Sequence, residues 1–350
     1  MYLTLKELRH DKLKFSALGL IIFLIVFLVL FITGLANGLA NDSGSAIKET
    51  PAKTFILQKG SQARLNRSNL TEQDWQKFHS QYHNDAAKLS VAQMTIQKAN
   101  NADKKTDITY FILDRSSFLA PTALKSQTDN HVYVSRKLEA EGYKKDDIFK
   151  DSSSGNTFKI AGFVNNESYS HAPVIYLNTH QAQNILPTSK QFNAIALKQK
   201  LAKNSKYQVI SQQTLINNIP GYSAEQSSLY LMIGFLYLIS LFVLAVFFYI
   251  INLQKISDFG TLKALGTKTS YLVQHVLTEM GLLSGIAILI SFGITYLIKI
   301  KMPASMPFSL TLPTLLATGL LFLFIALLSA LLSLIKVLKI DPINAIGGNN

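Results

Sequence analysis

The stretch Ile256-Ser-Asp-Phe-Gly-Thr-Leu-Lys-Ala-Leu-Gly-Thr-Lys268 decides the fold, because it is a short polar segment between two long apolar runs. The runs cover residues 229–253 and 271–298. A helix needs about 20 apolar residues to cross a bilayer, and both runs exceed that length. We therefore expect the stretch between them to be a loop at a membrane surface.

Within this loop the pattern predicts a short amphipathic helix. Asp258 is a suitable N-cap, and Gly266 is a suitable residue to follow the C-terminus. Phe259, Leu262 and Leu265 fall on one helical face. Such a helix needs a partner against which its apolar face can dock.

The same residues only superficially resemble a phosphate-binding loop. That motif requires four residues between its glycines and a lysine directly after the second. Here five residues separate Gly260 from Gly266, and Thr267 precedes Lys268. The spacing predicts that this chain binds no nucleotide, so ATP is expected on a separate polypeptide.

Composition indicates a membrane protein. Of the 350 residues 48% are hydrophobic, the mean hydropathy is +0.21, and the apolar residues gather in separate runs. The net charge of +13 is scattered over a polar middle section and the flanks of the apolar runs. This favours a basic surface near anionic lipid over nucleic-acid binding. The lack of cysteine excludes disulfides and Cys-ligated metals.

The order of polar and apolar segments predicts a membrane protein with four transmembrane α-helices and a large extracytoplasmic α+β domain between helices 1 and 2. The expected segments are a cytoplasmic amphipathic segment (1–14), transmembrane helix 1 (15–40), the α+β domain (41–227), helix 2 (228–254), the cytoplasmic coupling loop (255–270), helix 3 (271–298), an outer loop (299–309), helix 4 (310–335) and a cytoplasmic tail (336–350).

The orientation follows from basic residues. They mark the N-terminus, the coupling loop and the tail, which places all three in the cytoplasm, although Lys299 and Lys301 oppose this assignment. A cleaved signal peptide is the alternative for the first apolar run. That run is about twice the usual signal core and no A-x-A site follows, so we favour a retained helix.

The polar middle section alternates strand-like and helix-like runs. Strands are predicted at 53–57, 106–113, 131–135, 157–164, 174–177, 193–197 and 207–210, and helices at 71–89, 136–142 and 179–186. The first of these helices opens with Thr71-Glu-Gln-Asp74, an approximate capping box.

The segment from Asp258 to Gly266 resembles the cytoplasmic coupling helix of the FtsX/MacB-type permeases of ABC transporters, whose usual wording is E-I-G-x-L-K-A-L-G-A. The stretch Glu279-Met-Gly-Leu-Leu-Ser-Gly285 and the tail Lys339-Ile-Asp-Pro-Ile-Asn-Ala345 also resemble this family, and the topology extends the resemblance over the whole chain. The resemblance implies contact with a cytosolic ABC ATPase through Asp258, Phe259, Gly260, Leu262, Lys263, Leu265 and Gly266.

Three further stretches resemble a subgroup, the HrtB-like permeases associated with haem export in Gram-positive bacteria. They are Met1-Tyr-Leu-Thr-Leu-Lys-Glu-Leu8, Gly38-Leu-Ala-Asn41 and Tyr169-Ser-His-Ala-Pro-Val-Ile-Tyr176. This resemblance implies a homodimer in the cell membrane, two copies of the ATPase, and haem as a transported ligand rather than an intrinsic cofactor.

Candidate haem ligands come from two places. Tyr230 and Tyr237 lie seven residues apart on the second span, as an interfacial aromatic belt or as the wall of a flat porphyrin pocket. Tyr169 and His171 lie after a predicted strand, where an ordinary surface loop is the alternative. Because a phenolate can ligate ferric iron, Tyr169 and Tyr230 are the expected ligands, with His171 in reserve.

Other polar residues give weaker signals. His79 and His83 have metal-binding spacing, but no Glu or third ligand accompanies them, so no metal site is expected. Glu279 is an acid inside a predicted span, and structural pairing is the favoured interpretation. No arrangement of residues indicates a catalytic site.

Together these features predict a non-enzymatic permease subunit that couples ATP hydrolysis by a separate ATPase to extrusion of haem or a similar hydrophobic toxicant. The alternatives are a permease for antimicrobial-peptide resistance or for lipid or lipoprotein extrusion, and a non-transporting FtsX-type regulator of a cell-wall hydrolase.

Overall fold

The computed structural model describes residues 11–99, 101–126, 130–185, 192–202, 204–303 and 306–337. The chain forms two compact units. The helical unit runs up to Asn37 and resumes at Ser228–Met302 and from Phe308, and the sheet unit comprises Gly38–Ser227 with Pro303–Pro307. The start of the expected N-terminal segment, residues 1–10, and the tail motif 339–345 lie outside the described residues.

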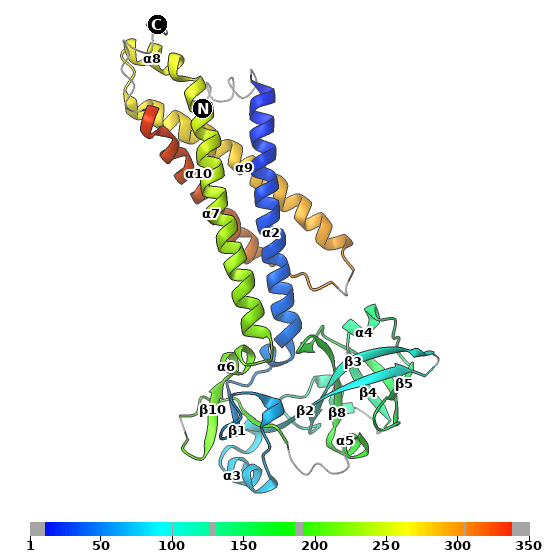
Figure 1. Ribbon diagram of the computed structural model, residues 1–350. Helices are drawn as coiled ribbons and strands as arrows, with labels where there is room; N and C mark the ends of the chain where they lie inside the picture. Colours follow the sequence, from blue (N-terminus) through cyan, green and yellow to red (C-terminus); the bar gives the residue numbers. More distant parts are fainter. Residues whose placement is uncertain are drawn as a thin grey trace. The chain divides into compact units, whose positions relative to one another are not determined.

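The four predicted spans are long helices: α2 (Lys12–Lys48), α7 (Tyr222–Gln254), α9 (Thr269–Lys301) and α10 (Leu312–Val337). Each is long and apolar enough to cross a membrane. The short helix α8 (Ile256–Ala264) joins α7 to α9 (Figure 1). Helix α2 extends beyond residue 40, the expected end of the first span, and its last residues belong to the sheet unit.

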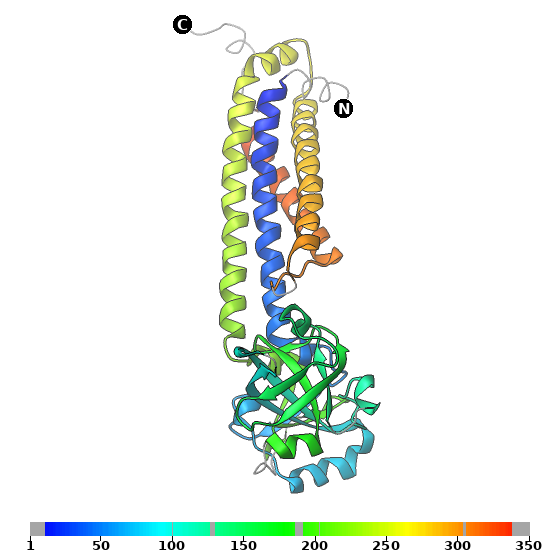
Figure 2. The same ribbon diagram turned by 90° about the vertical axis from the view of Figure 1, so that its right-hand side faces the viewer.

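Figure 2 shows the long helices of the helical unit from a second side. They pack around one apolar cluster and share interhelical hydrogen bonds. The Ser291 hydroxyl donates to the carbonyl of Phe23 at 3.1 Å, which joins α9 to α2. The Asn252 amide donates to the Ser333 hydroxyl at 2.8 Å, which joins α7 to α10. In an apolar medium such bonds favour helix association, because the alternative is an unsatisfied polar group.

The sheet unit contains ten strands among its described residues: β1 (Thr54–Gln58), β2 (Ala86–Lys98), β3 (Asn101–Leu113), β4 (His131–Ser135), β5 (Ile148–Asp151), β6 (Thr157–Val164), β7 (Ser168–Tyr169), β8 (Ala172–Asn178), β9 (Ala194–Leu197) and β10 (Tyr207–Ser211). They pair in the order β10-β1-β9-β2-β3-β8-β4-β6-β5, with β7 on β8. Because β5 also pairs with β2, six strands form a closed ring in the order β2-β3-β8-β4-β6-β5.

Short helices complete the sheet unit: η1 (Leu65–Arg67), α3 (Glu72–Tyr82), η2 (His83–Asp85), η3 (Thr122–Ser126), α4 (Lys137–Ala140), α5 (Thr179–Ile185) and α6 (Gln212–Asn217). The predicted α+β class is therefore confirmed, and all seven predicted strands coincide with or overlap observed ones.

The helix predicted at 71–89 is wrong in its second half. The capping box of Thr71 and Asp74 is present, but α3 ends at Tyr82 and β2 starts at Ala86. His83 has φ +46°, a conformation that ends the helix. Ala86 and the next residues pair with β9, and the rest of β2 pairs mainly with β3. Tertiary pairing thus overrides an Ala-rich local sequence.

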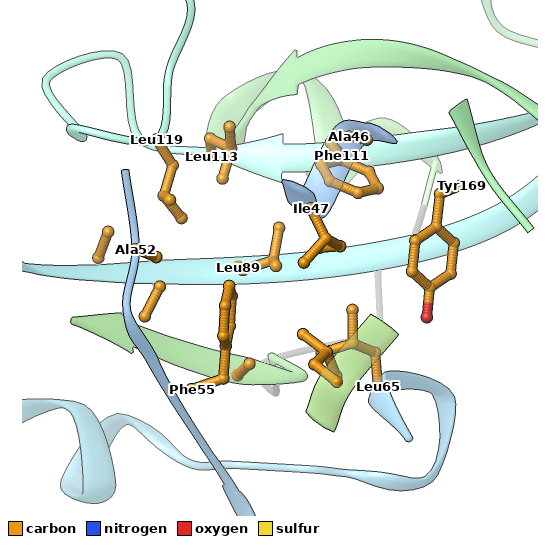
Figure 3. Packing of buried hydrophobic residues seen from close by; sticks show 14 of the residues in the cluster. Ala46, Ile47, Ala52, Phe55, Leu65, Leu89, Phe111, Leu113, Leu119 and Tyr169 are labelled. Atoms are coloured by element: carbon orange, nitrogen blue, oxygen red, sulfur yellow. The ribbon is translucent and has the colours of Figure 1, made fainter. Parts of the chain in front are cut away.

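A buried core in the sheet unit joins helix α2 to the sheet (Figure 3). Ala46 and Ile47, in the last turn of α2, pack with Phe55, Leu89 and Phe111 from three strands. The C-terminal end of α2 is therefore part of the sheet unit's core.

Candidate functional site

The helix α8 occupies the predicted coupling segment, but it begins earlier than expected. Its N-cap is Lys255, and Asp258 lies within the first turn without acting as the cap. Helix α8 starts this early because α7 ends at Gln254 and only Lys255 separates the two helices. The Phe259 N–H donates to the carbonyl of Lys255 at 3.0 Å, which starts the new helix without a side-chain cap.

The C-terminus of α8 is the one that the sequence predicts. The Gly266 N–H donates to the carbonyl of Lys263, and the Thr267 N–H donates to the carbonyl of Leu262, both at 3.0 Å. These two bonds form a Schellman motif, in which Gly266 adopts φ +88°. The motif turns the chain from α8 toward α9.

We expect Gly266→Ala to lower the free energy of unfolding by about 1 kcal/mol, because a side chain disfavours positive φ. The effect is conformational, since no atom lies within 4 Å of an added Cβ. Gly234→Ala on α7 is the matched control, because its Cβ also meets open space and its backbone is helical. Thermal unfolding in detergent measures both, and an equal response of the two variants would contradict this assignment.

The residues of α8 divide into a buried and an exposed set. Phe259 is 3% exposed and packs in the apolar cluster of the helical unit, and Leu262 packs against the same cluster. Leu265 does not share this face as expected, because it is the C-cap residue and is 78% exposed. Asp258 is also exposed. Phe259 therefore anchors α8, while Asp258 and Leu265 are open to a partner.

A buried ion pair fixes the start of α8. Lys255 Nζ lies 2.6 Å from Glu279 Oε1, and the side chains are 13% and 0% exposed. Lys255 Nζ also lies 5.3 Å from the ring centre of Phe15 on α2. The pairing expected of Glu279 is thus confirmed, and its partner joins the α7–α8 junction to α9.

Tyr169 lies in the sheet core rather than in a surface loop. It is 6% exposed, and its ring meets that of Phe111 edge-on at 5.8 Å between ring centres (Figure 3). Burial raises the pKa of its phenol. The small cavity beside it, about 60 Å³, is below the size of a ligand pocket.

His171 holds the β7–β8 hairpin to the end of α2. Its Nε2 lies 2.9 Å from Ser43 Oγ and 3.2 Å from Glu225 Oε1, and its Nδ1 lies 3.3 Å from Asp42 Oδ2. The N–H of Ser170 donates to the carbonyl of Ser43 at 2.8 Å. We call Asp42, Ser43, His171 and Glu225 the hairpin clasp.

The two tyrosines of α7 have different surroundings. Tyr230 is 60% exposed within the chain. Tyr237 is half-buried, packs against the apolar cluster of the helical unit and hydrogen-bonds Thr318. Of the two, only Tyr230 presents its phenol openly.

The rings of His79 and His83 lie 6.4 Å apart between centres, but the two residues do not share a helical face as their spacing suggested. His79 stacks on Trp75 at 4.7 Å between ring centres, whereas His83 follows the end of α3. No group of three or more His, Cys, Asp or Glu side chains suited to a metal ion occurs among the described residues.

Sequence reasoning missed the hairpin clasp and the partner of Glu279. Asp42, Ser43 and Glu225 lie far from His171 in the chain and show no local pattern. Lys255 had a usable signal, because a lysine directly after one span and an acid early in the next suit an interhelical pair.

The comparisons with known proteins agree with this architecture. The family model "FtsX-like permease C-terminal" matches residues 230–342. The chain is 32% identical over 359 residues to the putative hemin transport system permease protein HrtB of Staphylococcus haemolyticus, and the match covers 99% of each chain. It is 30% identical over 356 residues to the protein of the same name from Staphylococcus epidermidis, again over 99% of each.

Two solved structures also resemble the chain. The periplasmic region of MacB from Actinobacillus actinomycetemcomitans aligns with 49% of this chain and 94% of its own, at 13% identity and a TM-score of 0.35. The extracellular domain of YknZ from Gram-positive bacteria aligns with 45% and 98%, at 12% identity and a TM-score of 0.32. The full-length matches and the family model decide the assignment: this chain belongs to the FtsX-like ABC transporter permeases and, within them, to the HrtB group.

Proposed function

We propose that this permease exports haem, working as a homodimer with two copies of a cytosolic ATPase. The observation that carries the proposal is the match over 99% of the chain to relatives named as hemin transport permeases. The proposed orientation places both termini and α8 in the cytoplasm of a Gram-positive bacterium and the sheet unit outside.

ATP-driven movement enters through α8 in this proposal. The ATPase contacts the exposed Asp258 and Leu265, while buried Phe259 and the Lys255–Glu279 pair transmit the movement to the long helices. Helix α7 is continuous from Tyr222 to Gln254, and Glu225 in its first turn contacts His171. A displacement of α7 therefore acts directly on the hairpin that carries Tyr169.

Tyr169 and Tyr230 are the proposed haem ligands, with His171 in reserve. Tyr230 is open, whereas Tyr169 is buried and needs the hairpin to open. Release of the clasp supplies that opening, because His171 and Tyr169 lie in one hairpin. Burial raises the pKa of the Tyr169 phenol and so disfavours the phenolate. Ferric iron would favour the phenolate, because its positive charge takes the place of the phenol proton.

A haemin titration of the chain purified with its cognate ATPase tests the function. We expect a saturable Soret shift and a change in ATPase rate over the same concentrations. Absence of a saturable shift would overturn haem as the cargo and redirect the search to peptide or lipid extrusion. A chaining phenotype on deletion, without altered haem tolerance, would instead indicate a regulator of a cell-wall hydrolase.

A further inference from the structure

The sheet unit contains a second cavity that the haem proposal does not use. Its volume is about 380 Å³, within the range of small-molecule sites. The end of α2, the connection after β3 and the β6–β8 region line it, and Glu49, Phe118, Leu119, Val164, Glu167 and Tyr176 are among its lining residues. All of them belong to the sheet unit.

A buried carboxyl group gives this cavity its polarity. Glu167 is 8% exposed, and the Tyr176 hydroxyl donates a hydrogen bond to its Oε2. Burial raises the pKa of Glu167, and the charge of Glu49 raises it further, although the bond from Tyr176 opposes both. Burial also keeps the Tyr176 phenol protonated by raising its pKa, so it remains a donor.

No cation of the described residues neutralises this carboxyl pair. The ion pairs found among those residues include neither Glu49 nor Glu167. Lys198, which contacts the Phe118 ring, is paired with Asp85. The charged form of a buried acid beside a second acid is costly, so the group either takes up a proton, as the raised pKa of Glu167 indicates, or gains a positive partner.

The end of α2 adds to the negative potential. Glu49 directly follows the last residue of α2, so the cavity adjoins the negative end of the helix dipole. The Gln212 amide hydrogen-bonds the carbonyls of Ile47 and Lys48, but this neutral group brings no positive charge. Phe118, Leu119 and Val164 add apolar surface to the lining of the same cavity.

We infer that this cavity binds a small organic cation, with its ammonium group paired with Glu167 and Glu49 and its apolar body against Phe118 and Leu119. The anionic propionates of haem suit the cavity poorly, because they would face two carboxyl groups. A metal ion is also a poor match, since a third ligand is lacking among the described residues.

Three indole probes of matched shape test the inference on the full-length chain in detergent. Tryptamine carries an ammonium, tryptophol a neutral hydroxyl and indole-3-propionate a carboxylate. Isothermal titration should show saturable tryptamine binding with a Kd below about 1 mM, at least about tenfold weaker binding of tryptophol, and none of indole-3-propionate. Equal binding of the three probes, or no saturable tryptamine binding, would overturn the inference.

Variants locate the site. Glu167→Gln should weaken tryptamine binding at least about tenfold, because a charge-assisted hydrogen bond is lost. Glu139→Gln is the matched control, since it removes one acid from an exposed pair with Arg136 in the same unit. If Glu167→Gln fails to fold, Glu49→Gln at the exposed rim should still weaken binding. Tryptamine binding that is unchanged in folded Glu167→Gln and Glu49→Gln variants would refute the site. Haemin binding should be the same in these variants as in the parent chain, because the cavity is separate from the proposed haem ligands.

Discussion

Glu279→Leu is expected to lower the free energy of unfolding by about 3–5 kcal/mol, because it removes the carboxylate that pairs with the largely buried Lys255 ammonium. Lys255 is 13% exposed, and its Nζ lies 2.6 Å from Glu279 Oε1. The same change should uncouple the ATPase rate from haemin, since the pair fixes the start of α8. Thermal unfolding in detergent and ATPase assays measure the two effects.

The double variant Lys255→Met/Glu279→Leu isolates the cause. It removes both charges, so we expect it to recover most of the lost stability, as apolar replacements of buried ion pairs commonly do. Lys268→Met is the control, because this exposed lysine in the same loop should be replaceable without effect. A single variant as stable as the parent, or a double variant no better than the single one, would contradict the structural role of the pair.

The double variant Tyr169→Phe/Tyr230→Phe should abolish the saturable Soret shift with haemin, because it removes both proposed phenolate ligands. Each single variant should weaken binding. Phenylalanine keeps the ring of Tyr169 against Phe111, so the sheet core should stay folded. Absorbance titration measures the binding, and co-purification of the ATPase shows that assembly is intact.

Tyr133→Phe and Tyr249→Phe serve as controls for this experiment. Each removes a half-buried phenol that the proposal does not use, Tyr133 from the sheet unit and Tyr249 from α7. Haem binding retained in the double variant would refute the ligand assignment. A loss confined to His171→Phe would transfer the assignment to the reserve ligand.

The spans and the end of α8 were predictable because their causes are local. Uninterrupted apolar runs have no stable alternative to a membrane helix. Gly266 adopts the positive φ that ends α8, as its residue type suggests. By contrast, Asp258 has the residue type of an N-cap and is not one, because Lys255 starts α8 directly after α7. Local propensity marks a possible cap but not the exact start of a helix.

The sequence by itself determined the membrane class, the four long helices and the domain between the first two. The length of each apolar run and the spacing of its apolar residues are properties of one segment, so they can be read without knowing the tertiary structure. Only the tertiary structure decided that Tyr169 is buried, that His171 meets Asp42 and Glu225, and that Glu167 faces a cavity. These properties arise from contacts between strands and helices that are distant in the chain. Burial and electrostatic surroundings depend on those contacts, and no single segment encodes them.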